Sequence, residues 1–533
     1  MRQDAGSGRI DALQRLEWLV ALLATLAAVV LSLEFSRHAG AFWRDEVNSL
    51  NVALAPSLAE LWRLMEFESG PALWTLLLRV WAAAVGGSSD AALRMFGVLG
   101  GLALPAAVWF AGLRLGRGAP VVSLALLAVN PEVIRWSASL RPWGLGAALA
   151  VVALVLVREA GAEPGRRRVL LAALCAVLSV QCVYQNAVLL AASIAGAVAV
   201  ALVERRWRSA SVAVGIGLVA ALSLSIYLPT LGRIGEWSML NQAPVTLGLL
   251  APRGGAVFAA SGSLVLAGWL AFLGLALGLG CWQALRRDDR DGVVLFALVT
   301  ALAAVAGFAL FLLQVRYLTQ PWYYVGLLAV VAVCAEAALA ASLRAPVLRV
   351  GLALAVMLAG LPGAWSSLRA RQTNLDAIAA YLETHATRGD LVVANPWYYA
   401  ITLGRYYHGE AEVSAIPPLE DLRVHRFDLL KRQMASATAM APLEARVREV
   451  LEAGGQVWIV GGIAAPPRGR PPRSLSPPPL PSSGWAADPY RLVWTFQLGA
   501  LVAAHAEAST PVPIDVPGGP FEGAGLVLIR GWR

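Results

Sequence analysis

Two adjacent carboxylates near the beginning of the chain are the first residues that could do chemistry. Asp45 and Glu46 lie in the segment AFWRDEVNSLNVA, a few residues after a long apolar run, and Glu68 follows later in the same polar segment. A carboxylate in such a place can act as a general base and take a proton from an acceptor hydroxyl. The pattern therefore predicts proton abstraction from an acceptor that approaches an apolar span.

Basic and aromatic residues in later polar segments complement these carboxylates. The candidates are Arg94, Arg141, Arg316 and Tyr317. Guanidinium groups match the geometry of phosphate oxygens and neutralise a phosphate leaving group. Taken singly, each residue also has a structural interpretation: the acidic pair as part of a solvated loop, and the arginines as caps or anchors of helix ends. Their conjunction on one membrane face favours a reaction on a lipid phosphate.

The composition indicates a polytopic membrane protein. The 533 residues are 58% hydrophobic and only 14% charged, with a mean hydropathy of +0.64, whereas soluble proteins are about 25% charged. Lys431 is the only lysine among 43 basic residues, and the net charge is +9. We interpret the arginines as cytoplasmic-loop charge and possible anion-binding groups. Nucleic acid is not an expected partner.

Apolar runs upstream of residue 366 are candidate membrane spans. Several charged residues precede the first run and no small-residue cleavage site follows it, which predicts a retained anchor rather than a cleaved signal. The eleven runs are 18–35, 93–111, 120–133, 143–157, 169–185, 187–203, 210–228, 264–283, 293–313, 322–341 and 350–365. They define a transmembrane domain over residues 1–365.

Arginine clusters give an expected orientation, because cytoplasmic loops are enriched in basic residues. The clusters are Arg166, Arg167 and Arg168; Arg205, Arg206 and Arg208; Arg286, Arg287 and Arg290; and Arg344 and Arg349, with Arg114 and Arg117 in an earlier loop. The amino terminus is then cytoplasmic. The acidic pair, the 137–144 loop and everything after residue 366 fall on the outer face.

The run at 71–86 does not fit this count as a crossing. Its 14 to 16 helical residues would reach only about 21–24 Å at 1.5 Å each, and Arg79 lies in its middle. We expect a helix that lies in or dips into the outer interface. The alternative is a true crossing, with one of the other short runs lost from the count.

After residue 366 the composition becomes that of a small soluble domain. A helix at 374–384, a strand at 391–394, a second helix at 443–453 and a strand in QVWIVGG predict an extracytoplasmic α/β domain over 366–533. Proline density predicts a disordered loop at 464–484.

Motifs of common soluble enzymes are absent from the sequence, which has no phosphate-loop pattern, no paired CxxC and no HExxH. The four cysteines lie in apolar runs and are expected to be buried small hydrophobic residues. The five histidines are scattered, and of these only His38 is close in sequence to the membrane loops. A zinc site is therefore not expected.

The order and spacing of these segments resemble the integral-membrane glycosyltransferases with the GT-C fold. The similarity rests on the acidic loop and then on ESGPALWTLLLRVW, DAALRMFGVLGGL, LAVNPEVIRWSASLRPWGLGAALA and VRYLTQPWYYVGLLAV. The similarity covers most of residues 16–365. Within this class, the sequence most resembles the branch of protein O-mannosyltransferases and aminoarabinose transferases, which use polyprenyl- or dolichyl-phosphate sugars. The fold class implied is mostly α-helical.

The resemblance implies an inverting sugar transfer in which polyprenyl phosphate departs. The first-loop carboxylate that acts as base, or orients the acceptor, maps onto Asp45 with Glu46 beside it. The arginines that bind the lipid phosphate map onto Arg94 and Arg316. Glu68 falls where aminoarabinose transferases carry an acidic residue before their proline.

The chain departs from this pattern at two motifs. Gly70, Pro71 and Ala72 stand where many relatives have His-Pro-Pro, and Ser137 to Arg141 read SASLR where relatives read SQEAR. The lost histidine and glutamate argue against a metal site, so we expect no cofactor, although a divalent metal stays an open alternative.

Two functions of other classes remain as alternatives. One is a transporter or flippase, which would favour charges near mid-membrane and internal repeats. The other is a catalytically inactive envelope-assembly protein that keeps the fold alone. The expected partners are a polyprenyl-phosphate-linked sugar, an acceptor lipid, glycan or protein, and membrane lipids. The expected location is the bacterial inner membrane, with a periplasmic carboxyl-terminal domain.

Overall fold

The computed structural model describes residues 2–68, 70–87, 89–116, 118–286, 289, 291–343, 346–466 and 474–533, with side chains from residue 12 onward. Part of the predicted disordered loop at 464–484 and four arginines of the charge clusters (Arg117, Arg287, Arg290 and Arg344) lie outside the described residues. The rest of that loop includes a bridge between Leu480 and Gly484.

The chain forms two compact units, which we name here. The membrane unit comprises Met1–His38, Gly70–Leu228 and Pro244–Arg369. The sheet unit comprises Ala39–Ser69, Pro229–Ala243 and Ala370–Arg533. The first polar loop therefore clusters with the carboxyl-terminal residues, although it lies between two apolar segments in the sequence.

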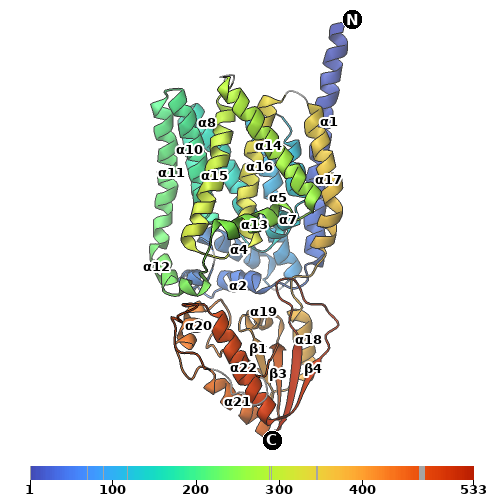
Figure 1. Ribbon diagram of the computed structural model, residues 1–533, viewed down its shortest axis with the longest axis vertical. Coiled ribbons are helices and arrows are strands. Elements are labelled where there is room, and N and C mark those ends of the chain that lie inside the picture. The colour runs from blue at the N-terminus through green and yellow to red at the C-terminus, as the bar shows by residue number, and fades with distance from the viewer. Residues whose placement is uncertain are drawn as a thin grey trace. The chain divides into compact units, whose positions relative to one another are not determined.

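The membrane unit is helical (Figure 1). Its elements are α1 (Arg2–His38), α4 (Ala72–Val85), α5 (Asp90–Ala111) with a π-helical turn (Gly112–Gly116), α6 (Val121–Ala128), α7 (Pro131–Ala138), α8 (Trp143–Ala162), α9 (Arg166–Cys182), α10 (Asn186–Val203), α11 (Trp207–Ser223), α13 (Leu247–Phe258), α14 (Ser263–Leu285), α15 (Val293–Val315), α16 (Val325–Ser342) and α17 (Pro346–Leu368), with 3₁₀ turns at Leu224–Tyr227 and Pro321–Tyr324.

Most of the eleven predicted spans correspond to long apolar helices. Within the described residues, nine helices are long and apolar enough to cross a membrane, or ten if the bent pair α6 and α7 counts as one span. The remaining run forms α9, which has 17 residues. The 71–86 run forms α4, whose 14 residues are fewer than the roughly 20 that a crossing needs.

The predicted span at 120–133 is not one straight helix. It divides into α6 and α7, which are bent by 77°. Asn130 caps the second helix, since its Oδ1 accepts hydrogen bonds from the amides of Glu132 (3.0 Å) and Val133 (3.1 Å). Pro131 follows, and proline lacks an amide hydrogen and disfavours helical geometry in the residue before it. The break is thus encoded by an Asn-Pro pair.

Three buried charges within the membrane unit, those of Glu17, Glu336 and Arg349, are paired with one another or with a helix end. Glu336 of α16 accepts hydrogen bonds from the amides of Val122 (3.0 Å) and Ser123 (2.7 Å) in the first turn of α6. Arg349 of α17 forms ion pairs with Glu336 and with Glu17 of α1. Glu336 thus satisfies donors at the amino terminus of α6, and the two ion pairs of Arg349 join α1, α16 and α17.

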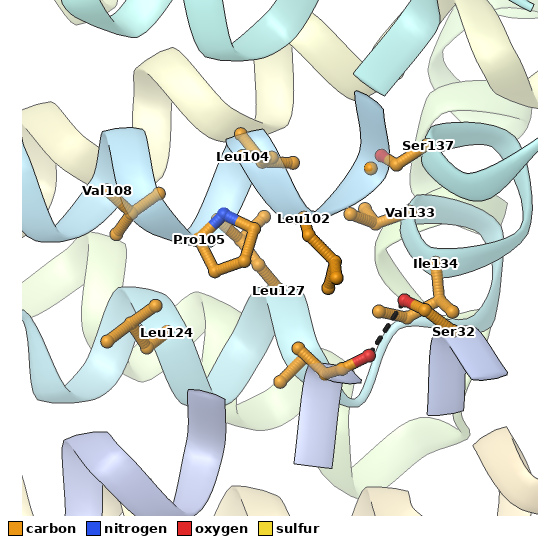
Figure 2. Close-up of a pocket in the computed structure, with 13 residues that line it drawn as sticks. Ser32, Leu102, Leu104, Pro105, Val108, Leu124, Leu127, Val133, Ile134 and Ser137 are labelled. Atoms are coloured by element: carbon orange, nitrogen blue, oxygen red, sulfur yellow. Dashed lines mark hydrogen bonds between the residues drawn. The ribbon is translucent and has the colours of Figure 1, made fainter. Parts of the chain in front are cut away.

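Close packing of backbones fixes the turn that leads from α7 to α8. An added Cβ at Gly97 of α5 would lie 2.4 Å from the Ser139 carbonyl oxygen, and one at Gly101 would lie 2.9 Å from that of Ser137. Small residues four apart on a membrane helix permit such an approach. Beside this contact, an apolar cavity (Figure 2) is lined by α1, α5, α6 and α7 and contains no charged side chain.

The sheet unit contains a mixed sheet, in the strand order β2-β1-β3-β5-β4. The elements are α2 (Arg44–Ala53), α3 (Leu58–Leu64) with a 3₁₀ turn (Met65–Phe67), α12 (Leu228–Trp237) with a 3₁₀ turn (Ser238–Asn241), α18 (Leu375–His385), β1 (Leu391–Asn395), α19 (Tyr399–Tyr406), β2 (Glu412–Ala415), α20 (Phe427–Met434), α21 (Ala441–Glu452), β3 (Gln456–Gly461), α22 (Asp488–His505), β4 (Ala506–Val512) and β5 (Leu526–Trp532).

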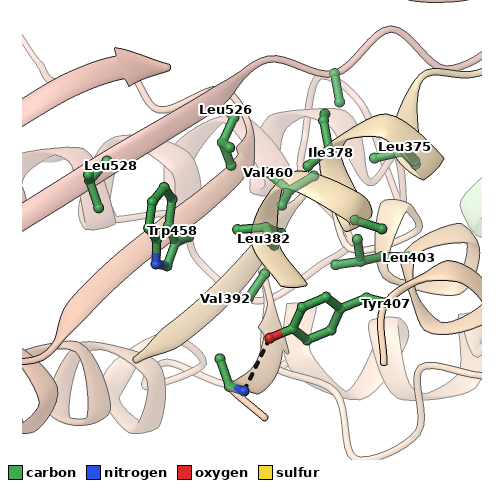
Figure 3. Close-up of a cluster of buried hydrophobic side chains, with 13 residues drawn as sticks. Leu375, Ile378, Leu382, Val392, Leu403, Tyr407, Trp458, Val460, Leu526 and Leu528 are labelled. Atoms are coloured by element: carbon green, nitrogen blue, oxygen red, sulfur yellow. Dashed lines mark hydrogen bonds between the residues drawn. The ribbon is translucent and has the colours of Figure 1, made fainter. Parts of the chain in front are cut away.

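The two predicted helix–strand pairs are confirmed in this sheet. β1 is parallel to β2 and β3, with Val392 opposite Trp458, and β5 runs antiparallel to β3 and β4. β1 is buried along its whole length, as expected for a strand with parallel neighbours on both sides. Figure 3 shows the core on one face, where α18 and α19 cover Val392, Trp458 and Leu526.

The Gly97 contact yields a test of the membrane unit. We expect Gly97→Ala to lower the stability by about 1–3 kcal/mol, because the new methyl group meets a backbone carbonyl that cannot move aside cheaply. Gly274→Ala in α14 is the matched control, since nothing lies within 4 Å of an added Cβ there. Thermal unfolding in detergent measures both variants. Equal midpoints would show that this contact does not hold the turn.

Candidate functional site

The site is built around α2, which carries the acidic pair in its first turn. Trp43 occupies the N-cap position, and Asp45 and Glu46 follow, where negative charge is favoured by the helix dipole. Consecutive residues on a helix differ in direction by about 100°. The two carboxylates therefore face different environments.

Arg44 anchors the start of this helix. Its amide donates to Glu522 Oε1 (3.2 Å), and its guanidinium donates to the Phe521 carbonyl (3.1 Å). The guanidinium also lies over the ring of Tyr398, 4.5 Å from the centroid. The arginine of the sequence motif thus holds α2 against the segment before β5, some 480 residues later in the chain.

Asp45 is the accessible member of the acidic pair. Its side chain is 20% exposed, and its Oδ1 lies 3.2 Å from Nε2 of His425 and 3.7 Å from Nε of Arg44. Glu46, by contrast, is fully buried. A general base must reach its substrate, so the geometry favours Asp45 over Glu46 for contact with an acceptor.

Glu68 lies in the interior of the same unit. Its Oε2 accepts hydrogen bonds from Ser49 Oγ (2.8 Å) and Asn48 Nδ2 (3.2 Å), and the residue is 5% exposed. Asn48 also donates to the Phe67 carbonyl (3.0 Å). The carboxylate therefore ties the end of the loop back onto α2.

The other predicted site residues belong to the membrane unit. Arg94 in α5 is buried, with its guanidinium 6.0 Å from the Phe35 ring centroid, and Arg141 is buried in the turn between α7 and α8. Arg316 caps the end of α15 with a left-handed φ of 56°, and it is exposed beside the half-buried Tyr317. The seven predicted residues thus divide between the two units.

His425 is a site residue that the sequence analysis missed. We expected only His38 to lie near the membrane loops, yet His425 contacts Asp45 through its ring and Asn48 through its backbone amide (2.8 Å). It precedes α20 and is separated from Asp45 by 380 positions. Nothing local in the sequence around it indicates this contact.

Glu522 was also missed, and its carboxyl group lies beside Arg44 at the start of α2. It is fully buried and accepts a hydrogen bond from Thr402 Oγ1 (2.9 Å). Burial raises the pKa of Glu522 to about 7, and the Arg44 guanidinium and the Thr402 hydroxyl offset only part of that rise. A proton at this carboxyl group is therefore coupled to the folding of the unit.

Among the described residues, there is no group of three or more His, Cys, Asp or Glu side chains that could hold a metal ion. At the motif where relatives carry histidine, an added Cβ on Gly70 would lie 3.6 Å from the Cys182 carbonyl. That distance is ordinary van der Waals contact. Backbone crowding thus does not explain the glycine.

The pKa of Glu522 predicts a pH dependence of stability. Between about pH 4.5 and 7 the folded protein keeps this proton while the unfolded chain releases it, so stability falls as pH rises, by up to about 3 kcal/mol. Glu522→Gln stays neutral and should be more stable than the wild type at pH 8 but similar at pH 4. Unfolding midpoints across this range measure the difference.

Glu507→Gln, at an exposed position of β4, is the control and should follow the wild type. A gap between Glu522→Gln and the wild type that is constant from pH 4 to 8 would contradict the assignment of a raised pKa to Glu522.

Comparisons with known proteins agree with the expected fold. The chain is similar to the crystal structure of ArnT from Cupriavidus metallidurans bound to undecaprenyl phosphate, with a TM-score of 0.56 at 11% identity over 96% of this chain and 98% of that chain. The apo structure of that protein gives a TM-score of 0.49 at 12% identity, over 86% and 93% of the two chains.

The oligosaccharyltransferase AglB from Archaeoglobus fulgidus, in complex with an inhibitory peptide and a dolichol-phosphate, gives a TM-score of 0.43 at 13% identity, over 83% of this chain and 69% of that chain. Neither a family model nor a curated protein matches the sequence. At such identities the likeness to the first ArnT structure establishes the fold alone. The predicted GT-C fold is thereby confirmed.

Proposed function

We propose that this protein is a membrane glycosyltransferase that moves a sugar from a polyprenyl-phosphate donor to an acceptor hydroxyl on the outer face of the bacterial inner membrane. The observation that carries the proposal is the accessible Asp45 carboxylate at the start of α2, in a chain that shares its fold over nearly its whole length with ArnT. That relative was crystallised with undecaprenyl phosphate.

The proposed reaction is an inverting displacement. Asp45 takes the proton of the acceptor hydroxyl while the hydroxyl oxygen attacks the anomeric carbon of the sugar. The bond between that carbon and the phosphate oxygen breaks, and polyprenyl phosphate leaves with the bonding electrons. Glu46, which is buried beside Asp45, is its proposed helper, and Glu68 ties the end of the first polar loop back onto α2.

Arginines of the membrane unit supply the positive charge that the leaving group requires. Arg94, Arg141 and Arg316, with Tyr317, are the proposed donor-binding residues, because guanidinium groups form charge-assisted hydrogen bonds with phosphate oxygens. Arg316 is the exposed one of the three, so it is suited to meet a lipid that arrives from the bilayer. The proposal includes no cofactor.

The proposed organisation follows the sequence: a transmembrane transferase domain over 1–365, and a periplasmic domain over 366–533. The amino terminus is cytoplasmic and the acidic loop faces outward. The buried charges of α1, α16 and α17 form ion pairs with one another. Since this pairing gives them a structural role, they do not indicate a transport pathway, which favours the proposed function over transport.

The first test removes the proposed base. Asp45→Asn keeps the shape of the side chain, but its amide cannot accept the proton, so transfer should fall by at least about 100-fold. The readout is the glycan or glycolipid that a deletion strain loses and the wild-type gene restores. Asp515→Asn, at an exposed loop position, is the control; full restoration by Asp45→Asn, present in membranes at the wild-type amount, would rule out the proposed base.

The second test concerns the donor. Arg316→Ala should weaken the binding of undecaprenyl phosphate to the purified protein by about 10–100-fold, the loss of a charge-assisted hydrogen bond. Arg388→Ala, whose side chain is 84% exposed in the sheet unit, should bind normally. An unchanged affinity of Arg316→Ala would exclude Arg316 as a phosphate ligand.

A further inference from the structure

The contact between His425 and Asp45 joins the candidate base to a part of the chain for which sequence analysis predicted no role. We infer that His425 is a positioning residue, which donates its Nε2 hydrogen to Asp45 Oδ1 and so fixes the carboxylate for attack on the acceptor proton. This inference rests on the proposed function. The inference adds to the proposed function a further residue, which acts through Asp45.

Aromatic neighbours hold the imidazole ring in one orientation. The ring stacks on Phe427, with centroids 5.6 Å apart and planes 13° apart, and Trp397 meets it edge-on at 6.0 Å and 86°. Trp397 is 1% exposed, and it also meets Phe427 edge-on at 5.7 Å. A ring fixed on two sides has little freedom to turn Nε2 away from Asp45.

The backbone of the histidine segment is tied to the same helix that carries Asp45. Asn48 accepts a hydrogen bond from the His425 amide (2.8 Å), and Asn51 donates to the Arg423 carbonyl (2.7 Å). Asp45, Asn48 and Asn51 are spaced by three residues, so they lie along one side of α2. These contacts fix the register between α2 and the segment before α20.

The ring nitrogens differ in a way that assigns the proton. Nδ1 is buried, and none of the described residues offers it a hydrogen-bond partner. A neutral ring with hydrogen on Nε2 leaves only a lone pair at Nδ1, whereas a charged ring or the other tautomer would bury an N–H group without an acceptor. The neutral form with hydrogen on Nε2 therefore fits this site, and in that form Nε2 donates to Asp45.

This assignment determines which atom holds each proton in the proposed reaction. His425 keeps its hydrogen throughout, and Oδ1 of Asp45 accepts it. The acceptor hydroxyl then gives its proton to Oδ2 of Asp45. The histidine gains and loses nothing in this step. It sets the direction of Oδ2, and displacement of a reacting group by about 1 Å can cost about 100-fold in rate.

A pair of substitutions separates this role from simple packing. His425→Phe preserves the aromatic contacts with Phe427 and Trp397 but has no donor. His425→Gln loses the ring but places an amide N–H near the position of Nε2. The matched readouts are the rate at which a deletion strain regains its missing glycan after induction, the amount of protein in membranes, and the unfolding midpoint of the purified protein.

We expect His425→Phe to slow restoration by about 10–100-fold, and His425→Gln to recover most of the wild-type rate even where its unfolding midpoint is lower. Binding of undecaprenyl phosphate should be unchanged in both variants, because donor affinity is assigned to the membrane unit. The wild type and Asp45→Asn accompany them as references.

Three results would overturn the inference. A wild-type rate for His425→Phe would show that packing alone suffices. Slow restoration by both variants at wild-type midpoints would mean that the imidazole itself exchanges a proton. A large loss of undecaprenyl phosphate binding would place the histidine in donor recognition. Failure of the proposed function is distinct from all three, since it appears as full activity of Asp45→Asn.

Discussion

Within the sheet unit, the start of α2 is held by contacts between Arg44 and one buried carboxyl group, Glu522. A fully buried carboxylate is costly to leave without compensation, and here the Arg44 amide, the Arg44 guanidinium and the Thr402 hydroxyl all approach it. Arg44 begins α2 and Thr402 belongs to α19. This interaction therefore joins the first polar loop to the carboxyl-terminal sheet, and it decides where the acidic pair is placed.

Once the start of α2 is fixed, the geometry of a helix separates the roles of three consecutive residues. Arg44 faces Glu522, Glu46 is fully buried, and the Asp45 side chain is 20% exposed. A sequence motif that resembles a single acidic cluster thus contains an anchor, an accessible carboxylate and a buried one. In the proposed function, the chemical role is that of Asp45, the residue that the anchor leaves accessible.

Sequence patterns predicted what depends on neighbours in the chain. The apolar runs gave the long helices, and the amphipathic pattern around 374–394 and 443–462 gave α18, β1, α21 and β3 within a residue or two. The break between α6 and α7 was missed because hydropathy averages over the Asn130-Pro131 pair, whose effect is conformational. His425 and Glu522 were missed for another reason: their contacts with the loop span hundreds of residues, and no periodicity encodes such a pairing.

The candidate base has an imidazole beside it, although position 70 is a glycine. Gly70 stands where many relatives carry a histidine, yet the imidazole of His425 lies beside Asp45. Asn48 accepts a hydrogen bond from the His425 amide and donates one to Glu68. All of these residues belong to the sheet unit, whereas Arg94, Arg141 and Arg316 belong to the membrane unit. In the proposed reaction the base and its orientation are therefore set by residues of the sheet unit alone.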